Sequence, residues 1–339
     1  GAGLGGANGY TESISKTSNI VLLKNTTYSL CPVNKNDWLI DADQIELNLV
    51  KNRGVADNAI VKFYGVPIFY LPKYSWVLSG RGSGFLTPDY SAYTDTATLP
   101  DAAGKTKSSY SIRIPYYFNL APDRDLLVAL NYMSSRRFIY EGKYRQLIAP
   151  KISPDHEDSM FQIEAKYLPE DKVTSLKRWL INFSDERDFS EKIHLSANYY
   201  RVSDKDYFKE IARTNTNALK LNSSLKLSYE DLESGFSTHV LTEAEQVVNA
   251  GSPGYTKAIE GSIGKNFTPK RFEISTLLVA TKFAHKTESK ESGLRTHSGL
   301  GVSTLVNVDY PTIKPRVSVT NTNYSLKNSK NINRIIFGA

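Results

Sequence analysis

Five histidines are the side chains that could most readily do chemistry at neutral pH, as metal ligands or as general acids and bases. They are scattered, without the close spacing that a zinc site needs, at positions His156, His194, His239, His285 and His297. The chain has no Gly-x-Ser-x-Gly motif and no phosphate-binding glycine loop. His194, on a polar strand face, is the best candidate for a catalytic group, but a single histidine on such a face is usually solvated. The sequence therefore predicts a protein that is not an enzyme, with neither a cofactor nor a metal site.

Cys31 is the only cysteine in the chain. A lone cysteine is most often a small buried hydrophobe or an inert thiol. In an exported protein, however, an odd cysteine suggests a partner elsewhere.

The formal net charge is +7, and a positive charge is common in nucleic-acid-binding proteins. Here Lys and Arg stand singly, alternate with acids and amides, and form neither a basic helix nor a zinc finger. We therefore expect no nucleic-acid partner and interpret the charge as that of a solvated polar face and its loops. Such a surface would also suit contact with an anionic glycolipid.

Apolar and polar residues alternate with a period of two over many segments, as in half-buried β-strands. The odd positions from Leu219 to Tyr229 are mostly apolar, and Ile193, Leu195, Ala197 and Tyr199 form a similar set. No apolar run approaches the ~20 residues of a membrane helix. The segments are about 8–12 residues long, enough to span a membrane as tilted strands, whereas soluble strands average about 5–6 residues. The pattern favours a membrane barrel over a soluble sandwich or a β-solenoid, which also alternate.

Turn-prone stretches separate these segments and define about twelve candidate strands after Ser111. They lie at residues 121–123, 134–135, 185–188, 252–254 and 268–270. Many segments end in Tyr or Phe, which is typical of the aromatic girdle of a membrane barrel.

The first ~80 residues have a different pattern, and we place a domain boundary in the Gly/Ser/Arg stretch at residues 79–83. Short strands are expected at residues 20–30, 38–50 and 59–64. Residues 65–72 contain two prolines, Pro67 and Pro72. Because proline cannot donate to a sheet ladder, this segment should be an edge strand or a connector.

An ordered series of motifs resembles the LptD (OstA/Imp) family of outer-membrane translocons for lipopolysaccharide (LPS). It begins with Tyr-Ser-Leu-Cys-Pro at 28–32, then Trp38, Gly-Val-Pro-Ile-Phe-Tyr-Leu-Pro at 65–72 and Ser-Gly-Phe-Leu-Thr-Pro at 83–88. It continues with Ile-Pro-Tyr-Tyr-Phe-Asn-Leu-Ala-Pro at 114–122, Tyr-Met-Ser-Ser-Arg-Arg at 132–137 and Glu-Gly-Lys-Tyr-Arg at 141–145. Arg178-Trp179 and Val-Ser-Asp at 202–204 follow in the same order. The resemblance runs from about Tyr28 to about Tyr207 and weakens after that.

The resemblance implies an all-β chain in two domains. Residues 1–80 would be the end of a periplasmic, OstA-like β-jellyroll, and residues 81–339 the N-terminal portion of a large antiparallel transmembrane β-barrel. The family barrel has about 26 strands and closes between its first and last strands, at a seam that is its proposed lateral gate. The closing strands are not expected in this chain.

The resemblance also implies roles for particular residues. Pro88 and Pro115 match prolines in the first two barrel strands, beside the gate, where a missing ladder donor would let strands part and a lipid leave sideways. Alternatively, both prolines only end strands. Cys31 matches a jellyroll cysteine that pairs with a cysteine near the barrel's C-terminus, which this chain lacks. Apolar jellyroll residues would line the acyl-chain path, although core packing explains them equally well: Ile45, Leu47, Ile60, Phe63, Ile68 and Phe69.

The function implied is that of a non-enzymatic translocon in the outer membrane of a Gram-negative cell, with its N-terminal domain in the periplasm. It would receive LPS from a periplasmic bridge and insert it into the outer leaflet. The expected partners are LPS, outer-membrane lipid, an LptE-like plug lipoprotein and an LptA-like bridge protein that pairs with the jellyroll edge. The alternative is a self-closing, porin-like channel, a class that lacks such an N-terminal domain.

Overall fold

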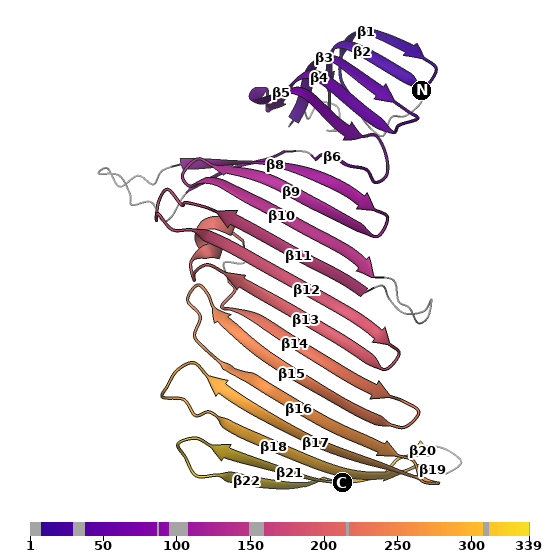
Figure 1. The fold of residues 1–339 in the computed structure, drawn as a ribbon, viewed down its shortest axis with the longest axis vertical. Coiled ribbons are helices and arrows are strands. Elements are labelled where there is room, and N and C mark those ends of the chain that lie inside the picture. The colour runs from indigo at the N-terminus through magenta and orange to yellow at the C-terminus, as the bar shows by residue number, and fades with distance from the viewer. Residues whose placement is uncertain are drawn as a thin grey trace. The chain divides into compact units, whose positions relative to one another are not determined.

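The computed structural model describes residues 8–29, 38–86, 88–94, 108–148, 159–214, 217–307 and 312–338, and these are almost entirely β. Their strands form a five-stranded sheet, a 15-stranded sheet and a two-stranded sheet. Figure 1 shows one short helical segment, the π-helix η1 (Phe208–Ala212), beside the strand ends of the large sheet. Within these ranges, no helix is both long and apolar enough to cross a membrane. The predicted all-β class is confirmed.

The chain divides into two compact units. The first comprises Gly1–Tyr93, Ser109–Ser134 and Phe138–Gly142, and the second comprises Thr94–Ser108, Ser135–Arg137 and Lys143–Ala339. The first therefore contains the five-stranded sheet together with the first strands of the large sheet.

The five-stranded sheet is a simple antiparallel meander in the order β1-β2-β3-β4-β5. Its strands are β1 (Thr11–Thr17), β2 (Ile20–Tyr28), β3 (Trp38–Asn48), β4 (Arg53–Phe63) and β5 (Val66–Val77). Strand β5 contains Pro67 and Pro72 and, among the described strands of this sheet, pairs with β4 alone. The predicted edge strand is thus confirmed, because an edge is where a missing donor is tolerated.

The large sheet is also antiparallel and follows the chain order. It begins with β6 (Gly84–Phe85), β7 (Asp89–Thr94), β8 (Ser108–Ala121), β9 (Arg124–Met133) and β10 (Arg137–Ile148). It continues with β11 (Ser159–Leu168), β12 (Arg178–Ser190), β13 (Ile193–Val202), β14 (Lys220–Asp231), β15 (Phe236–Val247), β16 (Tyr255–Phe267), β17 (Phe272–His285), β18 (Gly293–Thr304), β21 (Arg316–Leu326) and β22 (Ile332–Gly338). The two-residue strands β19 (Val306–Asn307) and β20 (Thr312–Ile313) form a separate small hairpin.

One predicted turn is wrong. Residues 185–188 continue strand β12, and the chain turns only after Ser190. Partners within the strand and across the β12–β13 pair satisfy these charges: Arg187 lies 3.1 Å from Asp185, and His194 Nδ1 lies 2.5 Å from Asp188. Such side-chain pairs stabilise a sheet in spite of a turn-like composition.

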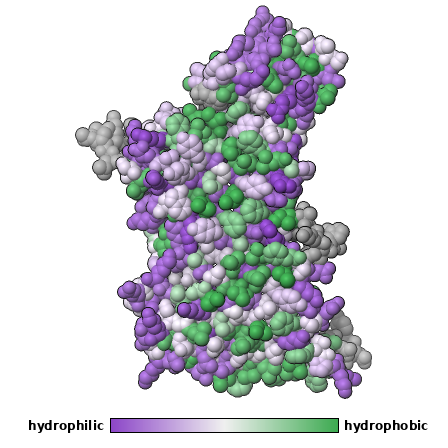
Figure 2. Space-filling model, in the orientation of Figure 1, coloured by the Kyte–Doolittle hydropathy of each residue, from purple (hydrophilic) through white to green (hydrophobic). Residues whose placement is uncertain are grey.

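The strands from β13 onward carry exposed apolar side chains on one face, which we call the apolar face. Across the sheet, Leu227 pairs with Val240 and Ile263 with Leu278, and these four side chains are 49–54% exposed. Figure 2 shows apolar side chains gathered over this region on the face turned to the viewer. Burying one such side chain is worth about 1.5–3 kcal/mol, so this face is suited to an apolar surrounding and not to water. The opposite, polar face holds residues such as Glu260, Ser262 and Thr281.

Candidate functional site

The first edge of the large sheet consists of two short strands in place of one long strand. Strand β6 pairs with β8 through Gly84–Tyr117 and Phe85–Tyr116, and β7 pairs with β8 further along. Pro88 lies in the break between β6 and β7. Pro115 lies within β8, and its carbonyl oxygen accepts a hydrogen bond from the Leu86 N–H at 3.0 Å. The structure therefore brings the two predicted gate prolines into the same edge pair of strands.

The position of Pro115 determines which strand pair it weakens. In an antiparallel ladder, the N–H and C=O of one residue point to the same neighbouring strand. Because the Pro115 carbonyl points to Leu86, the N–H that proline lacks would also have pointed there. Pro115 thus removes a hydrogen bond of about 0.5–1.5 kcal/mol from the β6–β8 pair, and none from its pairing with Ala129 of β9.

Aromatic side chains hold β6 where its backbone pairing is weak. The Phe85 ring stacks on Tyr74 of β5, with ring centroids 5.6 Å apart, and meets Tyr116 of β8 edge-on at 4.9 Å. Gly84 permits this approach, since a Cβ there would lie 3.1 Å from the Ser75 carbonyl oxygen. The edge strand is therefore fastened to β5 as well as to β8.

Arg81 forms a second connection that the sequence did not single out. Its guanidinium donates to the Tyr117 hydroxyl at 3.0 Å, to Asp125 at 3.2 Å and to the Pro122 carbonyl at 2.8 Å. Arg81 stands in the Gly/Ser/Arg stretch that was interpreted as a boundary, where a single arginine gives no pattern to recognise. It ties this stretch to β8 and to the turn that follows it.

The five-stranded sheet brings together only part of the predicted lipid lining. Ile45 is fully buried and Leu47 is 3% exposed, and both belong to a core cluster with Tyr74 and Trp76. Ile60 is only half-buried and lies outside the buried residues of that cluster. The side chains of Phe63, Ile68 and Phe69, and all of Cys31, lie outside the described residues.

The core of this sheet also perturbs a phenol. Burial raises the pKa of Tyr74 to about 12, and the neighbouring Tyr28 acts in the same direction. Burial likewise raises the pKa of Tyr28, whose ring lies 5.0 Å from that of Trp76. Both phenols therefore remain neutral at physiological pH.

A buried ionic network lies at the strand ends of the second unit. Arg178 Nη1 lies 3.1 Å from Asp171 and 2.9 Å from Glu210, and its Nε lies 2.7 Å from Asp204. Arg136 Nη1 lies 2.5 Å from Asp171 and 3.4 Å from Glu210. The side chains of Arg136 and Asp171 are fully buried, and that of Arg178 is 2% exposed.

Three of the sequence motifs each contribute one residue to this network. Arg136, Arg178 and Asp204 come from separate motifs, and the network joins the β9–β10 turn, the start of β12 and the segment after β13. Glu210, in η1, brings the helix into the same network. The acids Asp171 and Glu210 were not predicted from the sequence, because neither belongs to a recognisable motif. The arrangement pins the π-helix to the strand ends and offers no chemistry of its own.

The described histidines have ordinary partners on the sheet. His239 contacts Ser262 at 2.6 Å, His297 contacts Thr322 at 2.8 Å, and His285 contacts the Pro253 carbonyl at 3.2 Å. His156 lies outside the described residues. Within the ranges that the structure covers, no three His, Cys, Asp or Glu side chains form a group that could hold a metal ion.

Comparisons with known proteins agree with the motif resemblance. A family model described as "LptD: LPS transport system D" matches residues 177–336, which includes the region where the motifs weaken. The LPS-assembly protein LptD of Cupriavidus pinatubonensis is 31% identical over 57% of this chain and 22% of its own length. The protein of the same name from Shewanella sp. (strain ANA-3) is 24% identical over 91% of this chain and 38% of its own length. That of Methylococcus capsulatus is 26% identical over 89% of this chain and 28% of its own length.

The chain thus spans well under half the length of these curated relatives. Their shared name is that of an assembly protein and not of an enzyme. The alignment with the Shewanella protein covers 91% of this chain, so it includes most of the β strands of both sheets. The matched family model and the named relatives share one family, the LptD LPS-assembly proteins, and this chain is similar to it over most of its length.

Proposed function

We propose that this chain forms the end of the periplasmic jellyroll and the first strands of an outer-membrane LPS translocon, and that LPS leaves sideways at the edge pair containing Pro88 and Pro115. The proposal rests on how the strands of that edge are paired. The strand is broken at Pro88, and the donor missing at Pro115 belongs to the β6–β8 pair. Strand β6 would separate from β8 at low free-energy cost while the β8–β9 ladder stays intact, so the first strand would give way beside the seam with the closing strands.

The apolar face supports a membrane location. Its exposed Leu, Ile and Val side chains require an apolar surrounding, and strands of ten residues or more, such as β14 and β17, are long enough to cross a bilayer when tilted. In this setting the polar face would line the barrel interior. The five-stranded sheet would then lie on the periplasmic side.

The remaining partners follow from the similarity to LptD proteins and are part of the proposal. An LptA-like bridge protein would deliver LPS to the jellyroll by pairing with a sheet edge, and an LptE-like lipoprotein would occupy the barrel interior. Ile45 and Leu47 would contact acyl chains only if the core around Trp76 opens, since both are buried. Cys31 would pair with a cysteine elsewhere in the protein, in the oxidising periplasm.

The gate is tested by restoring the missing donors. In the intact protein in cells, Pro88→Val and Pro115→Val together supply two backbone N–H groups at the edge pair. One new hydrogen bond of about 1 kcal/mol would lower the population of the separated β6–β8 pair about fivefold. We expect less LPS on the surface of intact cells, measured by antibody binding. The matched control is Pro269→Val, in the exposed turn between β16 and β17.

The outcome separates the two functions considered. Normal surface LPS in the double variant, with the protein folded and present at normal level, would contradict a gate at this pair. If the intact protein also formed ion-conducting pores in planar bilayers without supporting LPS export, the porin-like alternative would replace the translocon.

A further inference from the structure

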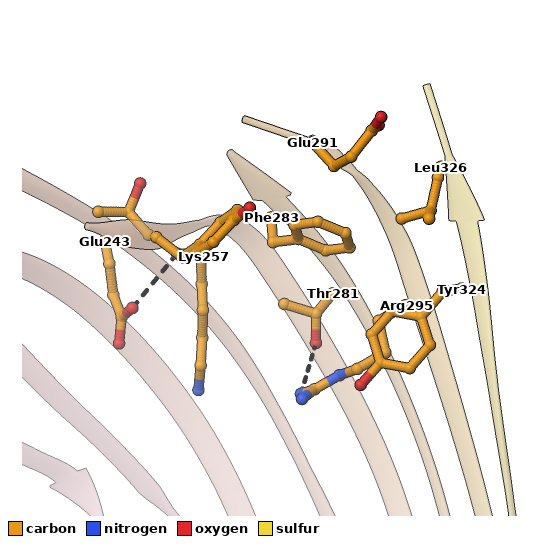
Figure 3. A pocket seen from close by; sticks show the side chains of 10 residues that line it. Glu243, Lys257, Thr281, Phe283, Glu291, Arg295, Tyr324 and Leu326 are labelled. Atoms are coloured by element: carbon orange, nitrogen blue, oxygen red, sulfur yellow. Dashed lines mark hydrogen bonds between the residues drawn. The ribbon is translucent and has the colours of Figure 1, made fainter. Parts of the chain in front are cut away.

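A hollow of about 540 Å³ opens on the polar face of the second unit, between β15 and β21. Its size falls within the roughly 300–1,000 Å³ of small-molecule sites. Tyr255, Lys257, Phe283, Arg295, Tyr324 and Glu243 are among its lining residues. Figure 3 shows the Lys257 and Arg295 side chains extending to the same side of Phe283. The hollow uses none of the residues of the gate or of the ionic network.

The strand register explains why the sheet is hollowed here. Phe283 pairs with Gly293, and Gly293 pairs with Leu326 on the next strand. Across these three paired strands, Gly293 therefore provides no side chain between the Phe283 ring and the Leu326 side chain. Only glycine fits at this position, because a Cβ on Gly293 would lie 2.2 Å from the Ser325 carbonyl oxygen.

Three aromatic rings border the hollow. Phe283 lies between the other two, with ring centroids 5.9 Å from Tyr255 and 6.2 Å from Tyr324. The interplanar angles are 68° and 72°, so these rings meet edge to face. They therefore do not stack flat on one another, and Tyr255 is 56% exposed. Aromatic rings offer a large, rigid apolar surface, and the tyrosines add a hydroxyl at its rim.

The charges around these rings favour an uncharged, hydroxyl-rich ligand. Lys257 and Arg295 lie 2.9 Å and 3.6 Å from Glu260, whose side chain is 7% exposed. Glu243 and Glu291 also line the hollow, so three carboxylates surround two cations. An anion would therefore meet no net positive field, and an apolar molecule would leave these groups without water. Hydroxyl groups both donate and accept, so they suit ammonium, guanidinium and carboxylate partners alike.

We propose that this hollow is a saccharide-binding subsite. The C–H face of a sugar ring would lie on one of the rings of Tyr255, Phe283 and Tyr324 and contact the edge of a neighbouring ring. Its hydroxyls would accept from Lys257 and Arg295 and donate to Glu243. A role for this subsite in contacting the glycan of LPS during export rests on the function proposed above. Sugar recognition by the hollow does not depend on that function.

The test is binding of two soluble sugars to the intact protein in detergent, followed by saturation-transfer NMR and titration. One probe is the deacylated, dephosphorylated core oligosaccharide of LPS, and the other is maltoheptaose, a glucan unrelated to LPS. We expect Phe283→Leu and Arg295→Gln each to weaken core-oligosaccharide binding about tenfold, equivalent to about 1.4 kcal/mol. The matched control is Phe272→Leu, at the other end of β17 and on the apolar face. The use of two pocket variants keeps the test valid if one of them does not fold.

Binding of both sugars would support a subsite that recognises sugar rings in general, and binding of the core oligosaccharide alone would support one fitted to LPS. Binding of neither sugar, or binding unchanged by both pocket variants, would overturn the proposal. Failure of the translocon proposal looks different. Surface LPS would then be insensitive to the proline substitutions while Phe283→Leu still weakens sugar binding.

Discussion

Replacing Arg178 by methionine should release the segment that carries the π-helix. Methionine keeps most of the apolar stem but removes the charge that contacts Asp171, Glu210 and Asp204. Asp171, which is fully buried, then keeps a single cation, Arg136 at 2.5 Å. Glu210 and Asp204 keep 18% and 29% of their side chains exposed and can regain water.

The expected loss in the free energy of unfolding depends on how far the remaining contacts and water compensate the three acids. Removing one partner of a buried ion pair costs about 3–5 kcal/mol. Because two of the three acids that Arg178 contacts remain partly solvated, we expect the lower end, about 3 kcal/mol. Adding Asp171→Asn removes the buried carboxylate, so the double variant should lose less stability than the sum of the single changes, by about 0.5–3 kcal/mol.

Two measurements check this on the intact protein folded in bilayers. Urea unfolding gives the free energy of unfolding, and hydrogen exchange follows the backbone amides of residues 203–214. The neighbouring Arg137→Met is the matched control, because its ion pair with Glu170 is exposed on both sides and should contribute at most about 1 kcal/mol. Equal effects of Arg178→Met and Arg137→Met, or unchanged exchange in residues 203–214, would refute the reasoning.

Three further changes test other parts of the structure. Leu227→Arg on the apolar face should lower the free energy of unfolding in bilayers by about 2–4 kcal/mol, whereas Ser224→Arg on the polar face should change it little. Gly54→Ala places a Cβ 2.5 Å from the Trp76 ring and should lower the free energy of unfolding by about 1–3 kcal/mol. Tryptophan fluorescence during unfolding measures this loss. Gly142→Ala is the control, because nothing lies within 4 Å of the new Cβ. Because burial raises the pKa of Tyr74 from its ordinary value of 10.0 to about 12, the five-stranded sheet should keep its full stability below pH 10.0 and lose part of it as pH rises towards 12. Tyr74→Phe should abolish that part of the alkaline loss, and an unchanged pH profile would contradict it.

Local alternation predicted much of the large sheet, because the side-chain period of a strand is a property of the backbone. The expected apolar sets from Leu219 to Tyr229 and from Ile193 to Tyr199 meet across the β13–β14 pair. Ile193 lies opposite Tyr229, Leu195 opposite Leu227, and Ala197 opposite Leu225. Leu221 belongs to the same odd-numbered set but is 3% exposed, since burial near a strand end depends on the neighbouring segments.

The remaining features depend on contacts between residues that are distant in sequence. Nothing in the sequence around Asp171 or Glu210 indicates that two arginines from other segments will neutralise them. The charged run at residues 185–188 has the composition of a turn, because the partners on β13 that keep it in a strand cannot be read from the local sequence. The sugar-sized hollow arises from the register that sets Gly293 beside Phe283, and a one-residue shift would remove it.

The row of rings that begins in the N-terminal core has a consequence for how the large sheet starts to assemble. Tyr28, Trp76, Tyr74, Phe85, Tyr116 and Phe118 contact one another in that order, at centroid distances of 4.6–5.6 Å. A two-residue strand has too few ladder bonds to choose its own register, and a neighbour with a proline gives it fewer still. The ring contacts supply the missing information, so the folded N-terminal sheet acts as a template that sets where the first strand begins. Loss of the Phe85 ring would then delay nucleation of the large sheet more than it would weaken the finished one.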